Sequence, residues 1–130
     1  MRRLVIILAM ATGMLGCGPN TAAPSAHIPV DQEWAVTGWS GGLPPNMTVT
    51  ISTDALYGRA PCNRFSGKFT ATHLENIQIG PLAVTRMTCP EISIETAILN
   101  DLSRMNKWSI VQTELRLRGS DGQYITLSQN

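Results

Sequence analysis

Apolar and polar residues alternate in short runs over most of the chain after residue 30. A period of two is typical of strands that bury one face, and β-branched residues favour such strands. In 114–118, for example, Leu115 and Leu117 alternate with charged residues, so one face of that strand is expected to be solvated. The same pattern predicts strands at 34–39, 47–52, 55–57, 65–70, 74–79, 82–87, 108–112, 114–118 and 123–128.

One segment, 90–105, has a helical period instead. Thr88 and Glu91 have the spacing of a capping box before it, and Pro90 fits a first helical turn. Apolar residues at helical spacing predict a buried face made of Ile94, Ala97, Ile98, Leu102 and Met105. Many short strands with one helix predict the α+β class, as a compact, strongly curved, antiparallel-rich sheet or partial β-barrel with one packed α-helix.

The first 16 residues have the organisation of a secretory signal peptide. Arg2 and Arg3 precede an apolar run over 4–15, and small residues follow it. That run is shorter than the roughly 20 residues that cross a bilayer, so we do not expect a membrane-spanning helix. Residues 17–30, with several prolines among small polar residues, are predicted to be a tether, and 31–130 a single domain.

The end of the apolar run, Met14-Leu15-Gly16-Cys17, resembles the bacterial lipobox. The resemblance implies cleavage after Gly16 and acyl chains on Cys17, which would anchor the protein to a membrane. Gly18 follows the anchor and favours the outer membrane, with the domain facing the periplasm of the bacterial cell envelope. The alternative is an ordinary cleaved signal in which Cys17 is incidental.

The charge of the chain bears on which partners can be excluded. The 130 residues carry a formal net charge of +1, and only 15% of them are charged. Loss of Arg2 and Arg3 with the signal leaves eight basic and nine acidic residues, a net charge of −1. Without a basic excess to neutralise phosphates, we expect no nucleic-acid partner.

Two cysteines remain beyond the anchor, Cys62 and Cys89. In an oxidising compartment an even pair indicates a disulfide, and closing this loop contributes roughly 3.5 kcal/mol of stability. A zinc site would need more ligands, and only His27 and His73 are present, at unsuitable spacing. A catalytic thiol would need a base and an orienting partner, and neither is evident. We therefore expect a disulfide, no metal site and no cofactor.

Two segments resemble signatures of the META domain family, the HslJ-like envelope proteins. The stretch 61–69 resembles the Cys-Asn-Arg-aromatic-x-Gly-x-aromatic signature, and 85–90 resembles Thr-Arg-Met-x-Cys-Pro. The resemblance covers roughly Glu33 to Leu127. Besides the two cysteines, the matching residues are Asn63, Arg64, Phe65, Gly67, Thr85, Arg86, Met87 and Pro90.

The resemblance implies a β-barrel-like fold with a packed helix, an envelope location, and links to stress or drug tolerance. It implies no established catalytic activity. In such a fold, Cys62 and Cys89 would bridge a strand to the helix entrance, while Gly67 would allow close backbone approach. Phe65 and Phe69 would fill the core, and Asn63 would close a turn.

Other candidate sites are weaker. Residues 38–42 match G-x-S-x-G, but prolines follow where a nucleophile elbow needs a helix, so we interpret the match as coincidence.

His27 and His73 are expected on the surface. A basic group near the signatures would form either an anion-binding patch or a solvated face: Arg59, Arg64, Lys68 and Arg86. Three tryptophans would either line a ligand cavity or pack in the core: Trp34, Trp39 and Trp108.

Taken together, these patterns predict a non-catalytic, lipid-anchored envelope protein that acts structurally or protectively through contacts with an unidentified protein. The alternative is a small binding module, for an apolar ligand or for a hydrolase that it inhibits. An apolar pocket beside Trp34 or Trp108 would favour the ligand, and a protruding ordered loop at 41–45 would favour inhibition. No acid–base constellation points to an enzyme.

Overall fold

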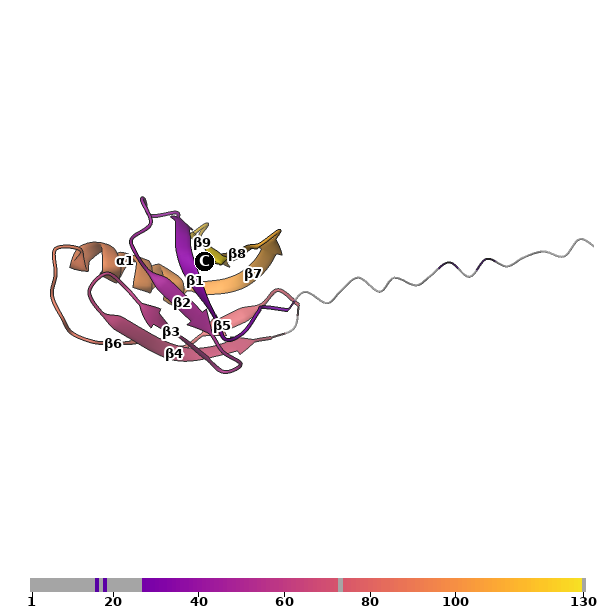
Figure 1. Ribbon diagram of the computed structural model, residues 1–130, viewed down its shortest axis with the longest axis horizontal. Coiled ribbons are helices and arrows are strands. Elements are labelled where there is room, and N and C mark those ends of the chain that lie inside the picture. Colours follow the sequence, from indigo (N-terminus) through magenta and orange to yellow (C-terminus); the bar gives the residue numbers. More distant parts are fainter. Residues whose placement is uncertain (1–15, 17, 19–26, 73, 130) are drawn as a thin grey trace, which may run out of the picture.

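Within the residues that the structure describes, the alternating segments form nine strands, and one helix lies between the sixth strand and the seventh (Figure 1). The computed structural model describes residues 16, 18, 27–72 and 74–129. The strands are β1 (Gln32–Trp39), β2 (Thr48–Ile51), β3 (Ala55–Arg59), β4 (Arg64–Ala71), β5 (Ile77–Ile79), β6 (Ala83–Val84), β7 (Met105–Val111), β8 (Glu114–Gly119) and β9 (Tyr124–Gln129), and the helix is α1 (Ile92–Ser103).

All strand pairs are antiparallel, in the order β5-β4-β3-β2-β1-β9-β8-β7, and β6 pairs with β4 beside β5. The two outer strands of this order, β5 and β7, meet at a seam that nearly closes the sheet into a barrel. An isolated bridge joins Asn76 to Lys107 there, and the Trp108 amide donates to the Glu75 carbonyl at 2.9 Å. The fold is therefore α+β with a strongly curved, barrel-like sheet, as the sequence predicts.

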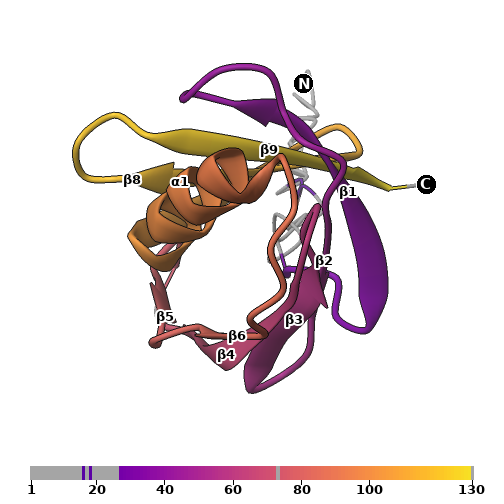
Figure 2. The ribbon, with the colours of Figure 1, turned by 90° about the vertical axis from the view of Figure 1, so that its left-hand side faces the viewer.

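The helix lies across one end of the barrel, as Figure 2 shows. Ile98 and Leu102 of α1 are fully buried and belong to the same core cluster as the inward-facing residues of the strands. Trp39, the last residue of β1, donates its indole N–H to the Asp101 carboxylate at 2.8 Å and so ties that strand to the helix. Residues 27–30, where the continuous described stretch begins, lie at the other end of the barrel (Figure 1).

Two predicted strands are at most half as long as expected. Only Ile77–Ile79 of 74–79 is a strand, because Leu74 has a left-handed backbone, with φ of 61°, in the turn that joins β4 to β5. Only Ala83–Val84 of 82–87 is a strand. Beyond it, the Met87 amide and carbonyl bond to a side chain instead of to a neighbouring strand, so the ladder cannot continue.

A helix forms where the sequence predicts one, but its end residues and its buried face differ from the prediction. It spans Ile92–Ser103, so Met105 belongs to β7 and Pro90 lies before the helix rather than in its first turn. The predicted capping box is wrong: Glu91 is the N-cap residue, and no side-chain hydrogen bond caps it. The buried residues are Glu95, Ile98, Leu99 and Leu102, while Ile94 and Ala97 are exposed.

Candidate functional site

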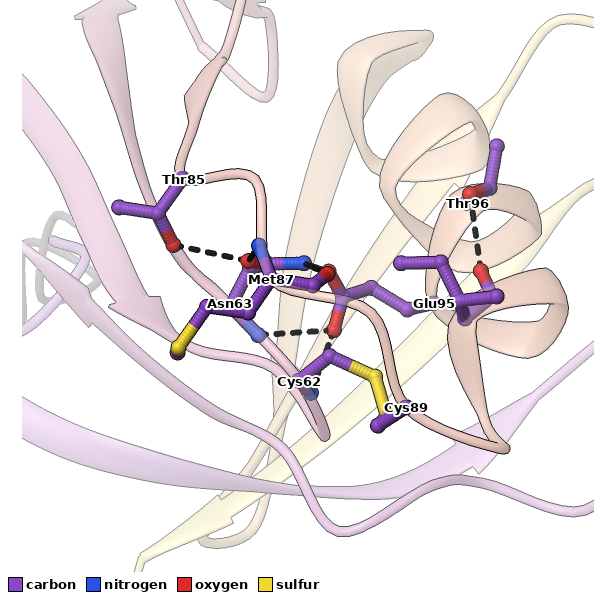
Figure 3. Close-up of a disulfide and its surroundings, with 8 residues drawn as sticks. Cys62, Asn63, Thr85, Met87, Cys89, Glu95 and Thr96 are labelled. Carbon is purple, nitrogen blue, oxygen red and sulfur yellow. Dashed lines mark hydrogen bonds between the residues drawn. A yellow bond between two sulfur atoms is a disulfide. The ribbon is translucent and has the colours of Figure 1, made fainter.

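The two signature segments meet at the entrance to α1 (Figure 3). Residues 60–63 form the connection from β3 to β4, where the Ala60 amide donates to the Asn63 carbonyl at 2.8 Å. Residues 85–91 run from β6 to the helix. A disulfide between Cys62 and Cys89 joins the two segments covalently, 27 positions apart in sequence. The bond brings the β3–β4 connection to the start of α1.

Asn63 fastens the same two segments by hydrogen bonds. Its side chain is buried, with 3% of the residue exposed. The amide nitrogen Nδ2 donates to the Met87 carbonyl at 3.0 Å and to Glu95 Oε1 at 2.6 Å. The oxygen Oδ1 accepts from Thr85 Oγ1 at 3.0 Å and from the Met87 amide at 2.6 Å. All four hydrogen-bonding positions of the amide are therefore used.

Glu95 brings the helix into this network. The residue is 1% exposed, and its carboxylate accepts three hydrogen bonds. Oε2 accepts from the backbone amides of Cys62 at 2.6 Å and Asn63 at 3.0 Å, and Oε1 accepts from Asn63 Nδ2. Hydrogen bonds to an ionised acceptor are stronger than neutral ones, so these donors offset the cost of burying the carboxylate. We call Asn63, Thr85, Met87, Glu95 and the disulfide the signature clip.

The clip presents few unbonded groups that could bind a ligand or react with a substrate. The Glu95 carboxylate is surrounded by donors from its own chain, and the two sulfurs are bonded to each other. Among the described residues, one group has the spacing of metal ligands, namely Cys62, Cys89 and Glu91. Two of those three ligands are the disulfide sulfurs. The arrangement therefore acts as a fastening of the fold.

A groove lies between α1 and residues 82–88, and the clip forms part of its wall. Its volume is about 660 Å³. Met87, 61% exposed, and Val84 place apolar side chains at its rim, and the exposed Arg86 adds a positive charge. We call it the signature groove; its lining includes Leu82, Val84, Met87, Thr96, Leu99 and Asn100.

The other signature residues have separate roles. Phe65 and Phe69 are buried on the inner face of β4. A Cβ added at Gly67 would lie 2.8 Å from Leu82 Cδ2 and 3.1 Å from the Pro81 carbonyl oxygen, so this glycine permits a close approach. The Arg64 amide donates to Thr85 Oγ1 at 3.0 Å, and its side chain is exposed. Pro90 is exposed and directly precedes the N-cap residue of α1.

The basic residues gather only in part. Arg59 and Arg64 face each other in the β3–β4 ladder, and Lys68 lies four positions further along β4, all three exposed. Arg86 lies on the separate segment that leads to α1. No salt bridge in the described part of the chain involves any of the four. The two alternatives for this group, an anion-binding patch and a solvated face, both stay predictions.

The three tryptophans are buried in the core: Trp34, Trp39 and Trp108. Trp108 also lines a second groove, of about 730 Å³, at the end of the barrel opposite α1. Its walls include Ile28, Phe69 and Ile110, and His27 is exposed at its edge. We call it the open-end groove.

The G-x-S-x-G match spans the last two residues of β1 and the start of the connection to β2. The Ser40 hydroxyl oxygen accepts a hydrogen bond from the Tyr124 amide at 3.1 Å, and the chain continues into β2 rather than into a helix. A nucleophile elbow requires that helix, so the match has no catalytic geometry. The same connection carries Leu43, which is 90% exposed.

Sequence reasoning missed Glu95 and Gly58. The positions 95, 98, 99 and 102 also have helical spacing, but a glutamate among them was not expected to be buried. A Cβ added at Gly58 would lie 2.0 Å from the Thr48 carbonyl oxygen, so β2 and β3 approach closely there. A glycine inside an alternating strand was the available signal for that contact.

Several predictions concern residues outside the part that the structure describes. They are the signal peptide up to residue 15, the lipidated Cys17, the tether at 19–26 and His73. Ile28, within the predicted tether, is buried in the core cluster. Within the described residues, no helix has the length and apolar character needed to cross a membrane.

Comparison with known proteins identifies a family and a fold. The family model of the META domain matches residues 27–130. A search of curated proteins found no significant match. An NMR structure of a protein from Burkholderia xenovorans is similar at 24% identity, with a TM-score of 0.64, over 78% of this chain and 83% of that one. A crystal structure of a DUF4847 family protein from Bacteroides vulgatus is similar at 15% identity, with a TM-score of 0.59, over 76% and 92%.

Proposed function

This chain belongs to the META domain family, and from that premise we propose that it is a non-catalytic protein of the bacterial cell envelope, anchored by lipid at Cys17. It faces the periplasm from the outer membrane and supports or protects the envelope during stress or drug exposure by contacting another protein. The lipobox-like residues before Cys17 support the anchor, and Gly18 supports the choice of membrane.

The observation that carries the proposal is the full engagement of the signature clip. Asn63 and Glu95 are buried and satisfied within the fold, and Cys62 and Cys89 are bonded to each other. The most distinctive residues of the sequence therefore hold the body rigid and do not present a reactive group to a substrate. This favours a role in which a stable surface is displayed over one in which a bond is broken.

The signature groove is the surface we assign to the protein contact. The clip fixes the segment 82–88 against α1, so the exposed Val84 and Met87 are held in place before a partner arrives. Apolar side chains on a preorganised surface lose little conformational entropy on binding. A periplasmic protein with a complementary apolar ridge is the partner that this surface fits.

The contact is tested in intact cells with a photo-crosslinking amino acid at Met87. The matched control carries the same amino acid at Gln78, an exposed position on β5 away from the groove. We expect one envelope protein to be joined repeatedly at position 87 and not at 78. Equal products at both positions would remove the groove as the contact surface.

The anchor and the protective role are tested on the same strain. Mass spectrometry of the membrane fraction should show a chain that begins at an acylated Cys17.

Cells that lack the gene should survive heat or antibiotics less well, and the wild-type gene should restore survival while Cys17→Ser should not. Full restoration by a soluble Cys17→Ser protein would show that the anchor is not needed.

A further inference from the structure

The open-end groove has largely apolar walls, and no helix or strand of the described residues crosses it. Figure 2 shows α1 lying across the opposite end of the barrel. The groove is bounded by the β2–β3 turn, the β4–β5 turn and β7, and Phe69, Trp108 and Ile110 form its walls. Phe69 and Trp108 are themselves buried, so the exposed apolar side chains at this groove are those of Leu74 and Val30. Neighbouring exposed apolar side chains are typical of binding surfaces.

The continuous described part of the chain begins at this groove. His27 and Ile28, the first residues of the continuous body, both line it. Cys17 lies ten positions before His27. Ten residues span at most about 35 Å even when fully extended. If Cys17 is acylated, as the proposed function holds, this end of the barrel stays close to the bilayer.

Leu74 gives this end an exposed apolar tip. It is 76% exposed, and its backbone is left-handed, with φ of 61°. A leucine adopts that conformation at a cost, and residues held in such conformations cluster at functional sites. The turn is closed by the Thr72 amide, which donates to the Asn76 carbonyl at 2.9 Å. Across the groove, Val30 adds a second exposed apolar side chain.

We infer that the open end of the barrel docks on the lipid bilayer that holds the Cys17 anchor, with Leu74 and Val30 inserted at the interface. The inference rests on the anchor in the proposed function. Apolar residues in such an interface add affinity to a lipid anchor, and one weak contact suffices because the anchor already holds the domain nearby. The signature groove, which α1 borders, then faces away from the bilayer and is accessible to a protein partner.

Charge contributes little to this docking, because the described lining of the groove contains no lysine or arginine. Glu75, the acidic residue in the groove lining, lies 3.9 Å from the Arg118 guanidinium, which balances its charge. Lys107 donates to Asn76 Oδ1 at 3.1 Å. The docking should therefore depend little on salt or on the content of anionic lipid, in contrast to attachment by a basic patch.

The test measures the depth of a spin label in vesicles of phosphatidylcholine that carry the acylated mature protein. The label is placed at Leu74→Cys, and the matched control at Leu43→Cys, an exposed leucine in the β1–β2 connection that lines a different groove beside Ile94. We expect the label at 74 to gain several-fold in collisions with oxygen and to lose access to a water-soluble nickel complex, at low and high salt alike. The label at 43 should stay accessible to the nickel complex.

Other results separate the alternatives. If Cys17 is acylated but both labels are equally accessible to the nickel complex, the domain is anchored to the bilayer but does not dock on it. If mass spectrometry shows no acyl group on Cys17, both the proposed anchor and the proposed docking are contradicted. If the label at 74 is equally shielded in a non-acylated Cys17→Ser chain without vesicles, a second copy or a free apolar ligand fills the groove, and bilayer docking is overturned.

Discussion

At the residue scale, Asn63 and Glu95 define each other's environment. Asn63 cannot turn its amide over, because Oδ1 accepts from Thr85 and Met87 while Nδ2 donates to Glu95. Its nitrogen therefore always faces the carboxylate. Glu95 in turn offers two oxygens to three donors, two of them backbone amides of the β3–β4 connection. A buried carboxylate in this position orients the loop that carries Cys62.

Replacing Glu95 by alanine should lower the free energy of unfolding by about 3 kcal/mol, because it leaves three buried donors without an acceptor. Glu95→Gln should also destabilise, since either orientation of its amide places an NH₂ group against a donor. Urea denaturation of each variant measures the change. Glu91→Ala, which removes an exposed carboxylate one turn earlier, is the control and should change stability by less than about 0.5 kcal/mol. Equal effects at 91 and 95 would contradict the role of the clip.

At the scale of elements, α1 shows how a polar contact sets the rotation of an amphipathic helix. Two faces of the segment are compatible with helical spacing, one through Ile94 and one through Glu95. The second is buried, which leaves Ile94 44% exposed. Three hydrogen bonds to Glu95 and the bond from Trp39 to Asp101 select this rotation. The exposure of Ile94 is a consequence of this rotation.

Truncation of Ile94 distinguishes these rotations, and truncation of Ile98, which lies on both faces, provides the reference for a buried position. Ile98→Ala should cost about 3 kcal/mol, because it opens a cavity in a fully buried part of the core. Ile94→Ala should change stability by less than about 0.5 kcal/mol, as an exposed substitution on a helix does. Thermal and urea unfolding of the pair provide the measurement. A large loss from Ile94→Ala would mean that the helix buries its other face in solution.

At the scale of the whole molecule, the barrel is held closed by contacts that are distant in sequence. The seam between β5 and β7 rests on the Asn76–Lys107 bridge and the bond from Trp108 to Glu75. The disulfide adds a covalent link between the sheet and the start of α1. A domain of roughly 100 residues has a small core, so a single cross-link is a large part of its stability.

Replacing both Cys62 and Cys89 by serine should lower the free energy of unfolding by roughly 3.5 kcal/mol, because the unfolded chain regains the entropy of an open loop. Denaturation of the wild type under reducing conditions should give a similar loss. The double variant itself should not respond to reductant. A variant as stable as the oxidised wild type would show that the clip's hydrogen bonds suffice without the bond.

Local features of the chain were enough to determine the strands, the helix, the cysteine pair and the family. Periodicity reports which face of an element is buried, and the signature residues lie close together in sequence, so neither needs tertiary information. Even the inward face of β4 follows from the alternation of Phe65, Gly67 and Phe69.

Only the tertiary structure decided which partners those residues meet. Asn63 reaches Glu95 across 32 positions, a contact that helps to set the rotation of α1. It reaches the Met87 backbone across 24 positions, and those bonds end β6 early. The seam and the two grooves likewise arise where distant segments come together. Hydrogen bonds between distant groups leave no periodic trace in a sequence, because they depend on how the elements pack and not on the spacing within any one of them.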